Sequence, residues 1–135
     1  MTMRLYQDTD RNNLIKLWNS IFPDPAPHNE PSTAIDAKLA VDDLIFVAEH
    51  EGTLMGMCIA GYDGIRGWLY TVGVSPEARH KGIGTALIKY SVDVLKGLGC
   101  TKVNLQIRAG NTEVTAFYAS LGFEVEERVS MGLLL

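Results

Sequence analysis

The sequence predicts a single α/β (α+β) domain over residues 1–135, with a mixed, mostly antiparallel and strongly twisted sheet. We expect six to seven strands, with about four helices on both faces of the sheet. Three apolar runs, residues 44–50, 53–62 and 68–74, follow one another across short turns, which is typical of an antiparallel meander. A helical pattern and a further apolar run over 101–107 come next, and a strand–helix–strand unit crosses over into a parallel pair.

The size and composition are those of one soluble globular domain. The chain has 135 residues, of which 47% are hydrophobic and 21% are charged, and its net charge is −4. An acidic balance argues against general affinity for nucleic acid, and no apolar run reaches membrane-spanning length. Cys58 and Cys100 have neither metal-ligand spacing nor a disulfide framework. We therefore expect a cytoplasmic monomer or homodimer with reduced core thiols, no metal, and no nucleic-acid or membrane partner.

The N-terminal third predicts one strand and two helices. Residues 3–7 alternate weakly and indicate a strand, after which Asp8 or Thr9 is suited to cap a helix. Three prolines between 23 and 27 end that helix, and Pro31 is well placed in the first turn of a second one. The loop over 22–30 is either a linker or a wall over a binding site.

Glycines punctuate the strands and helices that follow. Gly56 and Gly61 lie inside the run 53–62 and suggest bulges or close approach of another backbone. Asn111 is expected to cap a last helix, over about 112–121. Two closing strands, residues 123–127 and 129–135, complete the predicted sheet.

The turn after the strand 68–74 has the features of a phosphate site. Ser75-Pro76 ends the strand, and a helix opens at Arg79-His80-Lys81-Gly82-Ile83-Gly84. The first N–H groups of a helix have no intrahelical partner and carry partial positive charge, and glycines let an anion approach closely. The alternative is a basic surface turn that needs glycine for its shape.

Two common phosphate motifs fit this turn poorly. In a Walker A loop the lysine follows the glycine, whereas Lys81 precedes one, and a dinucleotide fingerprint needs a glycine where Leu87 stands. The turn instead resembles the acetyl-coenzyme A signature of the GNAT superfamily of N-acetyltransferases, Arg/Gln-x-x-Gly-x-Gly/Ala. The matching residues are Arg79, Gly82 and Gly84, preceded by Val72-Gly73-Val74 and Ser75-Pro76-Glu77.

The resemblance continues in the last third of the chain. Members commonly show an Asn, an Ala three residues later, a Tyr four after that, and then Gly-Phe. Here these are Asn111, Val114 in place of Ala, Tyr118 and Gly122-Phe123. The similarity covers nearly the whole chain after residue 44, and the turn over 61–67 looks like that of the small bacterial YpeA-type acetyltransferases.

The resemblance implies acetyl transfer from acetyl-CoA directly to an amine of a small molecule or a peptide or protein acceptor. It implies that the diphosphate lies on the N–H groups from His80 to Thr85, and that the pantetheine arm pairs with the backbone of Val72 and Val74. Gly73 would form a bulge, and Asn111 would contact the arm, cap its helix, or do both. The expected cofactor-binding residues are Val72, Gly73, Val74, Arg79, His80, Lys81, Gly82, Ile83, Gly84, Thr85 and Asn111.

The same resemblance assigns the acetyl-transfer step to two groups of this chain. The backbone N–H of Val74 would face the thioester oxygen, and Tyr118 would be the general acid that protonates the departing thiolate. The alternative for Tyr118 is packing in the core with a hydrogen bond to a backbone carbonyl. Many members carry a glutamate near the position of Trp68, but this strand has no carboxylate. The candidates for the general base are then Asp63, Glu113, Tyr70 or a water chain.

The acceptor is left open by the sequence. Four aromatic residues could line an acceptor wall or simply pack in the core: Trp18, Tyr62, Trp68 and Tyr70. Asp24 and Glu30 could attract a cationic amine or remain solvated loop charges. Because the strand lacks a carboxylate, a non-catalytic acetyl-CoA-binding sensor or regulatory module is the alternative function. A binder of another phosphorylated ligand is a further one.

Overall fold

The computed structural model describes residues 1–23, 27 and 30–135. No helix in these ranges is both long enough and apolar enough to cross a membrane. In chain order the elements are β1 (Thr2–Leu5), η1 (Asp8–Asp10), α1 (Arg11–Ile21), α2 (Pro31–Leu39), β2 (Ile45–His50), β3 (Thr53–Tyr62), β4 (Gly67–Val74), η3 (Pro76–Ala78), α3 (Ile83–Gly97), β5 (Val103–Leu105) and α4 (Thr112–Ser120).

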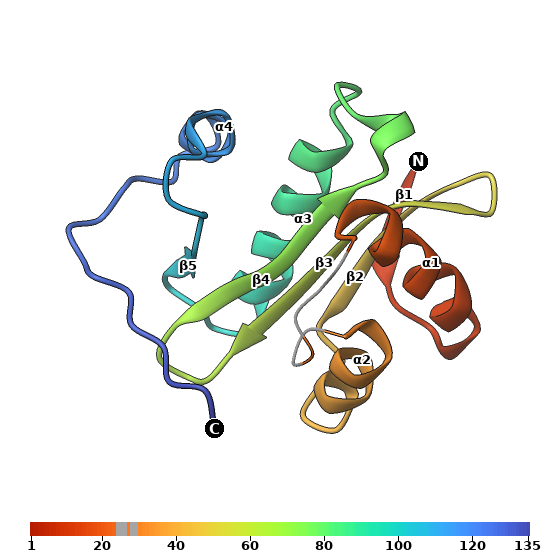
Figure 1. Cartoon of the computed structure of the whole chain (residues 1–135), viewed down its shortest axis with the longest axis horizontal. Helices are drawn as coiled ribbons and strands as arrows, with labels where there is room; N and C mark the ends of the chain where they lie inside the picture. Colours follow the sequence, from red (N-terminus) through yellow and green to blue (C-terminus); the bar gives the residue numbers. More distant parts are fainter. Residues whose placement is uncertain (24–26, 28–29) are drawn as a thin grey trace.

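One mixed sheet organises the molecule, with its strands in the order β1-β2-β3-β4-β5. The first three pairings are antiparallel, and β4 pairs with β5 in parallel. The prediction that the strands on either side of α3 are parallel neighbours is therefore confirmed. The fold is an α/β mixture with four α-helices, as predicted, in the described part of the chain (Figure 1).

Two apolar cores lie on opposite faces of the sheet. On β2, Ile45 and Val47 pack with α1 and α2, whereas Phe46 packs with α3. This alternation is the period of two that a strand buried on both sides requires. In Figure 1 α1 and α2 accordingly flank one side of the sheet and α3 the other.

The sheet has five strands, so the predicted six to seven strands were wrong. Residues 123–127 and 129–135 form no strand, although their apolar residues alternate. Val125 is 84% exposed and Val129 is 89% exposed, so no apolar face is buried there. The segment contacts β5 through side chains, as in the hydrogen bond that Asn104 Nδ2 donates to Glu126 Oε1 at 2.7 Å. Lys102, directly before β5, also pairs with Glu126 at 2.5 Å. A ladder needs a partner edge, and β5 provides only three residues.

The bulges lie beside the predicted positions rather than on them. Gly73 pairs regularly with Met57, whereas the β3–β4 register shifts across Tyr70, which is the extra residue. Gly73 has another reason to be glycine: a Cβ there would come within 2.9 Å of the Ile21 side chain at the end of α1. The second predicted bulge is confirmed next to Gly56, where the β2–β3 register shifts, and Gly61 pairs regularly.

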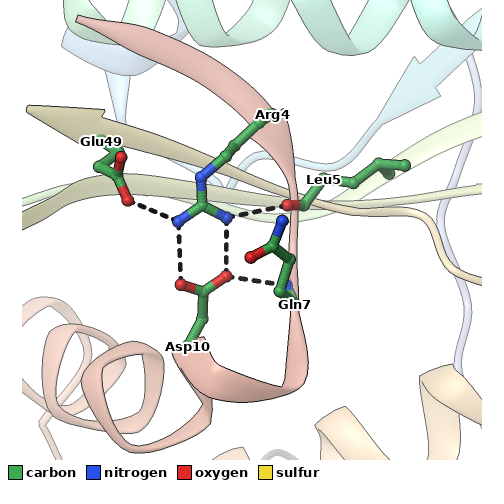
Figure 2. Close-up of polar contacts among 5 residues, drawn as sticks. All are labelled: Arg4, Leu5, Gln7, Asp10 and Glu49. Carbon is green, nitrogen blue, oxygen red and sulfur yellow. Dashed lines mark hydrogen bonds and ion pairs between the residues drawn. The ribbon is translucent and has the colours of Figure 1, made fainter. Parts of the chain in front are cut away.

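A charged cluster fastens the N-terminus to the sheet (Figure 2). Arg4 forms two bonds of 2.8 and 2.9 Å to the Asp10 carboxylate and a third, of 2.6 Å, to Glu49. Asp10 also accepts the backbone N–H of Gln7 at 2.8 Å. Asp10 ends η1 and is the N-cap residue of α1, which begins at Arg11, so the prediction of Asp8 or Thr9 as the cap was wrong.

Candidate active site

The site begins where β4 separates from β5. The parallel register joins Gly67 to Val103 and ends at Leu69, opposite Leu105. β4 then continues to Val74 with β3 alone as its partner. The bulge at Tyr70 lies at the point of separation, and bulges bend a strand and increase its twist. The result is a length of β4 whose backbone has an open side.

The orientation of the backbone groups on this open side follows from one hydrogen bond. The Ser75 N–H donates to the Met55 carbonyl of β3 at 2.8 Å. Residues along an antiparallel strand face their partner alternately, so Gly73 also faces β3, whereas Val72 and Val74 face away from it. The Arg79 Nε–H reaches the Val74 carbonyl on that outer side at 3.3 Å. The structure therefore places the N–H groups of Val72 and Val74 at the open edge.

The turn that follows has the backbone shape expected of an anion site. η3 leads into His80 (φ +64°) and Gly82 (φ +78°), and Gly82 is the N-cap of α3. Within the described ranges no side chain caps this helix, and its first ladder bond runs from the Ala86 N–H to the Gly82 carbonyl. Arg79 and Lys81 flank the turn with exposed side chains. The N–H groups of Ile83 to Thr85, which have no intrahelical partner, and the positive charges of Arg79 and Lys81 therefore lie together at the exposed start of α3.

Gly84 lies on the side of this helix that approaches α4. A Cβ there would be 3.4 Å from the Phe117 ring and 3.7 Å from Val74. Close packing against Phe117 is thus a reason for the glycine beyond the two that the sequence offered, ligand access and the shape of the turn. Sequence reasoning did not single out Phe117, whose place directly before Tyr118 was the available signal.

Asn111 and Tyr118 both lie where the sequence placed them on α4. The Asn111 Oδ1 accepts the Val114 N–H at 3.2 Å, so its role as helix cap is confirmed. Tyr118 is 8% exposed and makes edge contacts with Phe117 and Phe123. No hydrogen bond joins its hydroxyl to any residue in the described ranges, which departs from the carbonyl bond of the alternative interpretation.

The surroundings of Tyr118 keep its phenol protonated. Burial raises its pKa to about 12, and the neighbouring Cys58 contributes to the same shift. Cys58 itself is fully buried, and burial raises the pKa of its thiol to about 11. Tyr118 thus has a proton to donate at neutral pH, whereas Cys58 lacks the thiolate that a nucleophile needs.

A large cleft of about 1660 Å³ lies between α3, β5, α4 and the C-terminal segment, and Tyr118 lines it. Six cationic side chains border the cleft: Arg66, Lys89, Lys96, Lys102, Arg108 and Arg128. Three carboxylates border it as well: Asp93, Glu124 and Glu126. In a chain of net charge −4 this excess of cations suits a polyanionic ligand. Sequence reasoning missed the cluster because its members come from separate segments.

Two of the candidate bases are poorly suited to that role. The Asp63 Oδ1 accepts the N–H groups of Ile65 (2.7 Å) and Arg66 (2.8 Å), and these bonds hold the pKa of Asp63 below its usual value. Burial raises the pKa of Tyr70, which keeps that phenol neutral. Glu113 lies in the first turn of α4.

In residues 1–23, 27 and 30–135 no group of three or more His, Cys, Asp or Glu side chains is placed to hold a metal ion.

Of the two acidic residues in the loop before α2, Asp24 lies outside the described ranges and Glu30 is a helix cap. The Glu30 carboxylate accepts the backbone N–H groups of Ser32 (3.1 Å) and Thr33 (2.9 Å) and caps α2. Hydrogen bonds from Ser32 and Thr33 lower the pKa of Glu30 to about 2. The suggestion that the loop is a linker or a wall over the site rests mainly on residues 24–26 and 28–29, which also lie outside the described ranges.

Comparison with known proteins agrees with this geometry. The model of the acetyltransferase (GNAT) family matches residues 11–123. An acetyltransferase of Yersinia pestis (strain Pestoides F) is 36% identical over 133 residues, which are 98% of this chain and 94% of that protein.

Solved structures show the same fold. The ribosomal-protein-S18-alanine N-acetyltransferase of Escherichia coli superimposes with a TM-score of 0.79 at 23% identity, over 91% of this chain and 77% of that one. AAC(6')-Iy, solved in complex with the bisubstrate analog CoA-S-monomethyl-acetylneamine, gives a TM-score of 0.82 at 21% identity, over 99% and 97% of the two chains.

The described residues thus bring together an unpaired edge of β4, a basic turn at a helix start and a buried tyrosine beside a cationic cleft. The chain belongs to the acetyltransferase (GNAT) family and is an acyltransferase. The resemblance stated from the sequence is thereby confirmed.

Proposed function

We propose that the protein transfers the acetyl group of acetyl-CoA directly to the nitrogen of an amine. The observation that carries this proposal is the open side of β4, where the N–H groups of Val72 and Val74 point outward and the strand runs straight into the basic turn. An extended ligand with amide groups at one end and phosphates at the other matches both parts of this site.

The fit to coenzyme A rests on features of the turn and the strand. The amides of the pantetheine arm pair with Val72 and Val74 as an added strand would. The N–H groups from His80 to Thr85, together with Arg79 and Lys81, hold the diphosphate. A Cβ at Gly82 would meet no atom within 4 Å, so the surface there is open to a ligand. The aminoglycoside N-acetyltransferase AAC(6')-Iy has been solved in complex with CoA, which supports this choice of co-substrate.

Two of the chemical steps are assigned to groups of this chain. The Val74 N–H donates to the thioester oxygen as negative charge develops there. Tyr118 gives its proton to the sulfur as the carbon–sulfur bond breaks, since its raised pKa keeps the phenol protonated. The acceptor ammonium must first lose a proton. Asp63 is held ionised by its turn and Tyr70 is held neutral, so Glu113 and water at the open edge are the candidates left to accept that proton.

Two measurements on the whole protein test the function. Calorimetry with acetyl-CoA measures binding, and release of free coenzyme A thiol in a panel of amines measures transfer. We expect binding together with amine-dependent thiol release. Binding without release for any amine would instead support the non-catalytic sensor, which the lack of a carboxylate on β4 favours. Loss of both signals would point to another phosphorylated ligand at the same turn.

A further inference from the structure

Two aromatic rings stand together at the bulge of β4. The rings of Trp68 and Tyr70 stack with their centroids 6.4 Å apart and their planes 25° apart. Tyr70 is 65% exposed, so much of its side chain is open to solvent. Trp68 is partly buried, so the ring of this pair that is most open to a ligand is that of Tyr70.

Gly61 of β3 fixes the position of this aromatic pair. A Cβ at Gly61 would lie 3.0 Å from the Tyr70 ring, so the ring rests directly over the glycine backbone. The same Cβ would lie 3.6 Å from the Nζ of Lys38, which places α2 beside the pair. Gly61 forms no bulge in β3, and the space that its missing side chain leaves is occupied by the Tyr70 ring.

The charges of two carboxylates, Asp42 and Asp63, reach the Tyr70 side of the pair. Asp42 and Asp63 both act on Tyr70 and, after burial, add to the rise of its pKa. Lys38 is paired with Asp42 at 2.9 Å, so these two charges offset one another. The Asp63 Oδ1 accepts two backbone N–H groups, whereas its Oδ2 has no hydrogen bond within the described ranges. The Arg66 guanidinium donates to the Ile65 carbonyl at 3.5 Å and makes no hydrogen bond to Asp63 within the described ranges, while its charge contributes to the lowered pKa of Asp63.

The distance from this pair to the reacting centre can be estimated along β4. Val72 and Val74 follow Tyr70 by two and four residues, and a strand rises by roughly 3.3 Å per residue. The aromatic pair is therefore about 7–13 Å from the N–H groups at the open edge. One elongated molecule can reach from the pair to the reacting centre.

We propose that Trp68, Tyr70 and Asp63 form a subsite for a second positive charge of the acceptor, so that the preferred acceptors are linear diamines or polyamines. This inference rests on the proposed acetyl transfer, whose reacting amine would occupy the open edge. The distal ammonium lies against the exposed aromatic faces, where the ring quadrupole attracts a cation, and beside the Asp63 carboxylate. A monoamine of the same length leaves this subsite empty.

Two acceptors that differ only in the distal group test the proposal. The probes are 1,6-diaminohexane and 6-amino-1-hexanol, compared by kcat/KM for thiol release from acetyl-CoA. After correction for its two equivalent amines, we expect the diamine to be preferred about 2- to 30-fold, the range that cation–π contacts support. Equal values for the two probes would overturn the subsite while leaving acetyl transfer intact. If neither probe caused thiol release from acetyl-CoA, linear diamines would not be acceptors and the proposal would be wrong.

Variants locate the preference. Tyr70→Leu removes the ring face and should bring the diamine preference close to one, whereas Tyr70→Phe keeps the ring and should retain it. Asp63→Asn keeps the Oδ1 that accepts the turn N–H groups and removes the charge, so the preference should fall without loss of folding. A preference that survives both Tyr70→Leu and Asp63→Asn would overturn the assignment.

A binding measurement keeps the inference testable apart from turnover. The indole N–H signal of Trp68 is followed by NMR during titration with 1,6-diaminohexane, with 1,6-hexanediol as the neutral control. We expect the diamine alone to shift this signal. Trp18, a residue of α1 that is 3% exposed and packs in the core with residues of β2 and β3, is the internal reference. An unmoved Trp68 signal at saturating diamine, or equal shifts with the diol, would refute the subsite.

Discussion

At the scale of single residues, the role of Tyr118 depends on one hydroxyl. Tyr118→Phe keeps the edge contacts with Phe117 and Phe123 and removes only the donor. We expect kcat to fall by about a hundredfold or more, with coenzyme A affinity nearly unchanged. Single-turnover rates and calorimetry measure the two effects. Tyr90→Phe, which alters a partly buried tyrosine of α3, is the control.

The raised pKa of Tyr118 adds a pH dependence. A general acid works while it is protonated, so a pKa of about 12 puts the loss of its function at pH values near 12. The rate should therefore show no alkaline decline from this residue between pH 7 and 10. A decline in that interval that disappears in Tyr118→Phe would show that the phenol titrates far lower than its buried environment implies.

Gly82 offers a matched test of the turn, because Gly52 has nearly the same backbone. Their φ angles are +78° and +79°, and a Cβ at either would meet no atom within 4 Å. Gly82→Asp adds a negative charge where the diphosphate would lie and should weaken coenzyme A binding tenfold or more. Gly52→Asp carries the same backbone strain in the β2–β3 turn and should bind as the parent does. Equal loss in both variants, measured by calorimetry, would assign the effect to strain and not to the turn.

At the scale of elements, the open side of β4 makes a prediction about individual amides. The N–H of Gly73 faces β3 and should exchange slowly with or without ligand, whereas those of Val72 and Val74 should exchange quickly in the free protein. Coenzyme A should slow the exchange of Val72 and Val74 at least tenfold and leave Gly73 unchanged. Exchange followed residue by residue by NMR decides this. Protection of all three amides alike would indicate general tightening of the strand.

The same element shows what its sequence can predict. The run over 68–74 predicted β4, and Ser75-Pro76 predicted its end, because glycine and proline mark the ends of strands and helices locally. The bulge, however, is at Tyr70 and not at Gly73. Its position depends on how β3 and α1 pack on either side, as the contact of Gly73 with Ile21 shows. Such contacts join distant segments and leave no local pattern.

At the scale of the whole molecule, long-range pairing also decides the limits of the sheet. Alternation over 123–135 predicted strands, but alternation shows only that a segment suits an edge. The edge offered by β5 is three residues long. The Glu126 carboxylate accepts hydrogen bonds from the side chains of Lys102 and Asn104, and no backbone ladder forms there. The cationic cleft beside Tyr118 was likewise beyond reach, because its lining comes from α3, β5 and the C-terminal segment.

The stability of the whole fold should depend on pH through the cluster that holds β1 to β2 (Figure 2). The Arg4 guanidinium holds the pKa of the Asp10 carboxyl below its usual value of 3.8 in the folded state. A lowered folded-state pKa stabilises the protein above the unfolded-state pKa, near 4, and this contribution is lost as pH falls through the folded value. Asp10→Asn removes the charge and should cost about 1.5–3 kcal/mol at pH 7, the range for hydrogen bonds to charged groups.

The melting temperatures of the parent and Asp10→Asn test this linkage between pH 7 and pH 2.5. The variant should melt several degrees lower at pH 7, and the difference should shrink steadily below pH 4 as the parent carboxylate takes up its proton. Asp36→Asn removes the partner of Arg11 in an ion pair whose Asp36 side chain is 66% exposed, and it should change the melting temperature little at any pH. A difference for Asp10→Asn that stays constant across the range would mean that the shape of the side chain, and not the charge paired with Arg4, fastens the N-terminus to the sheet.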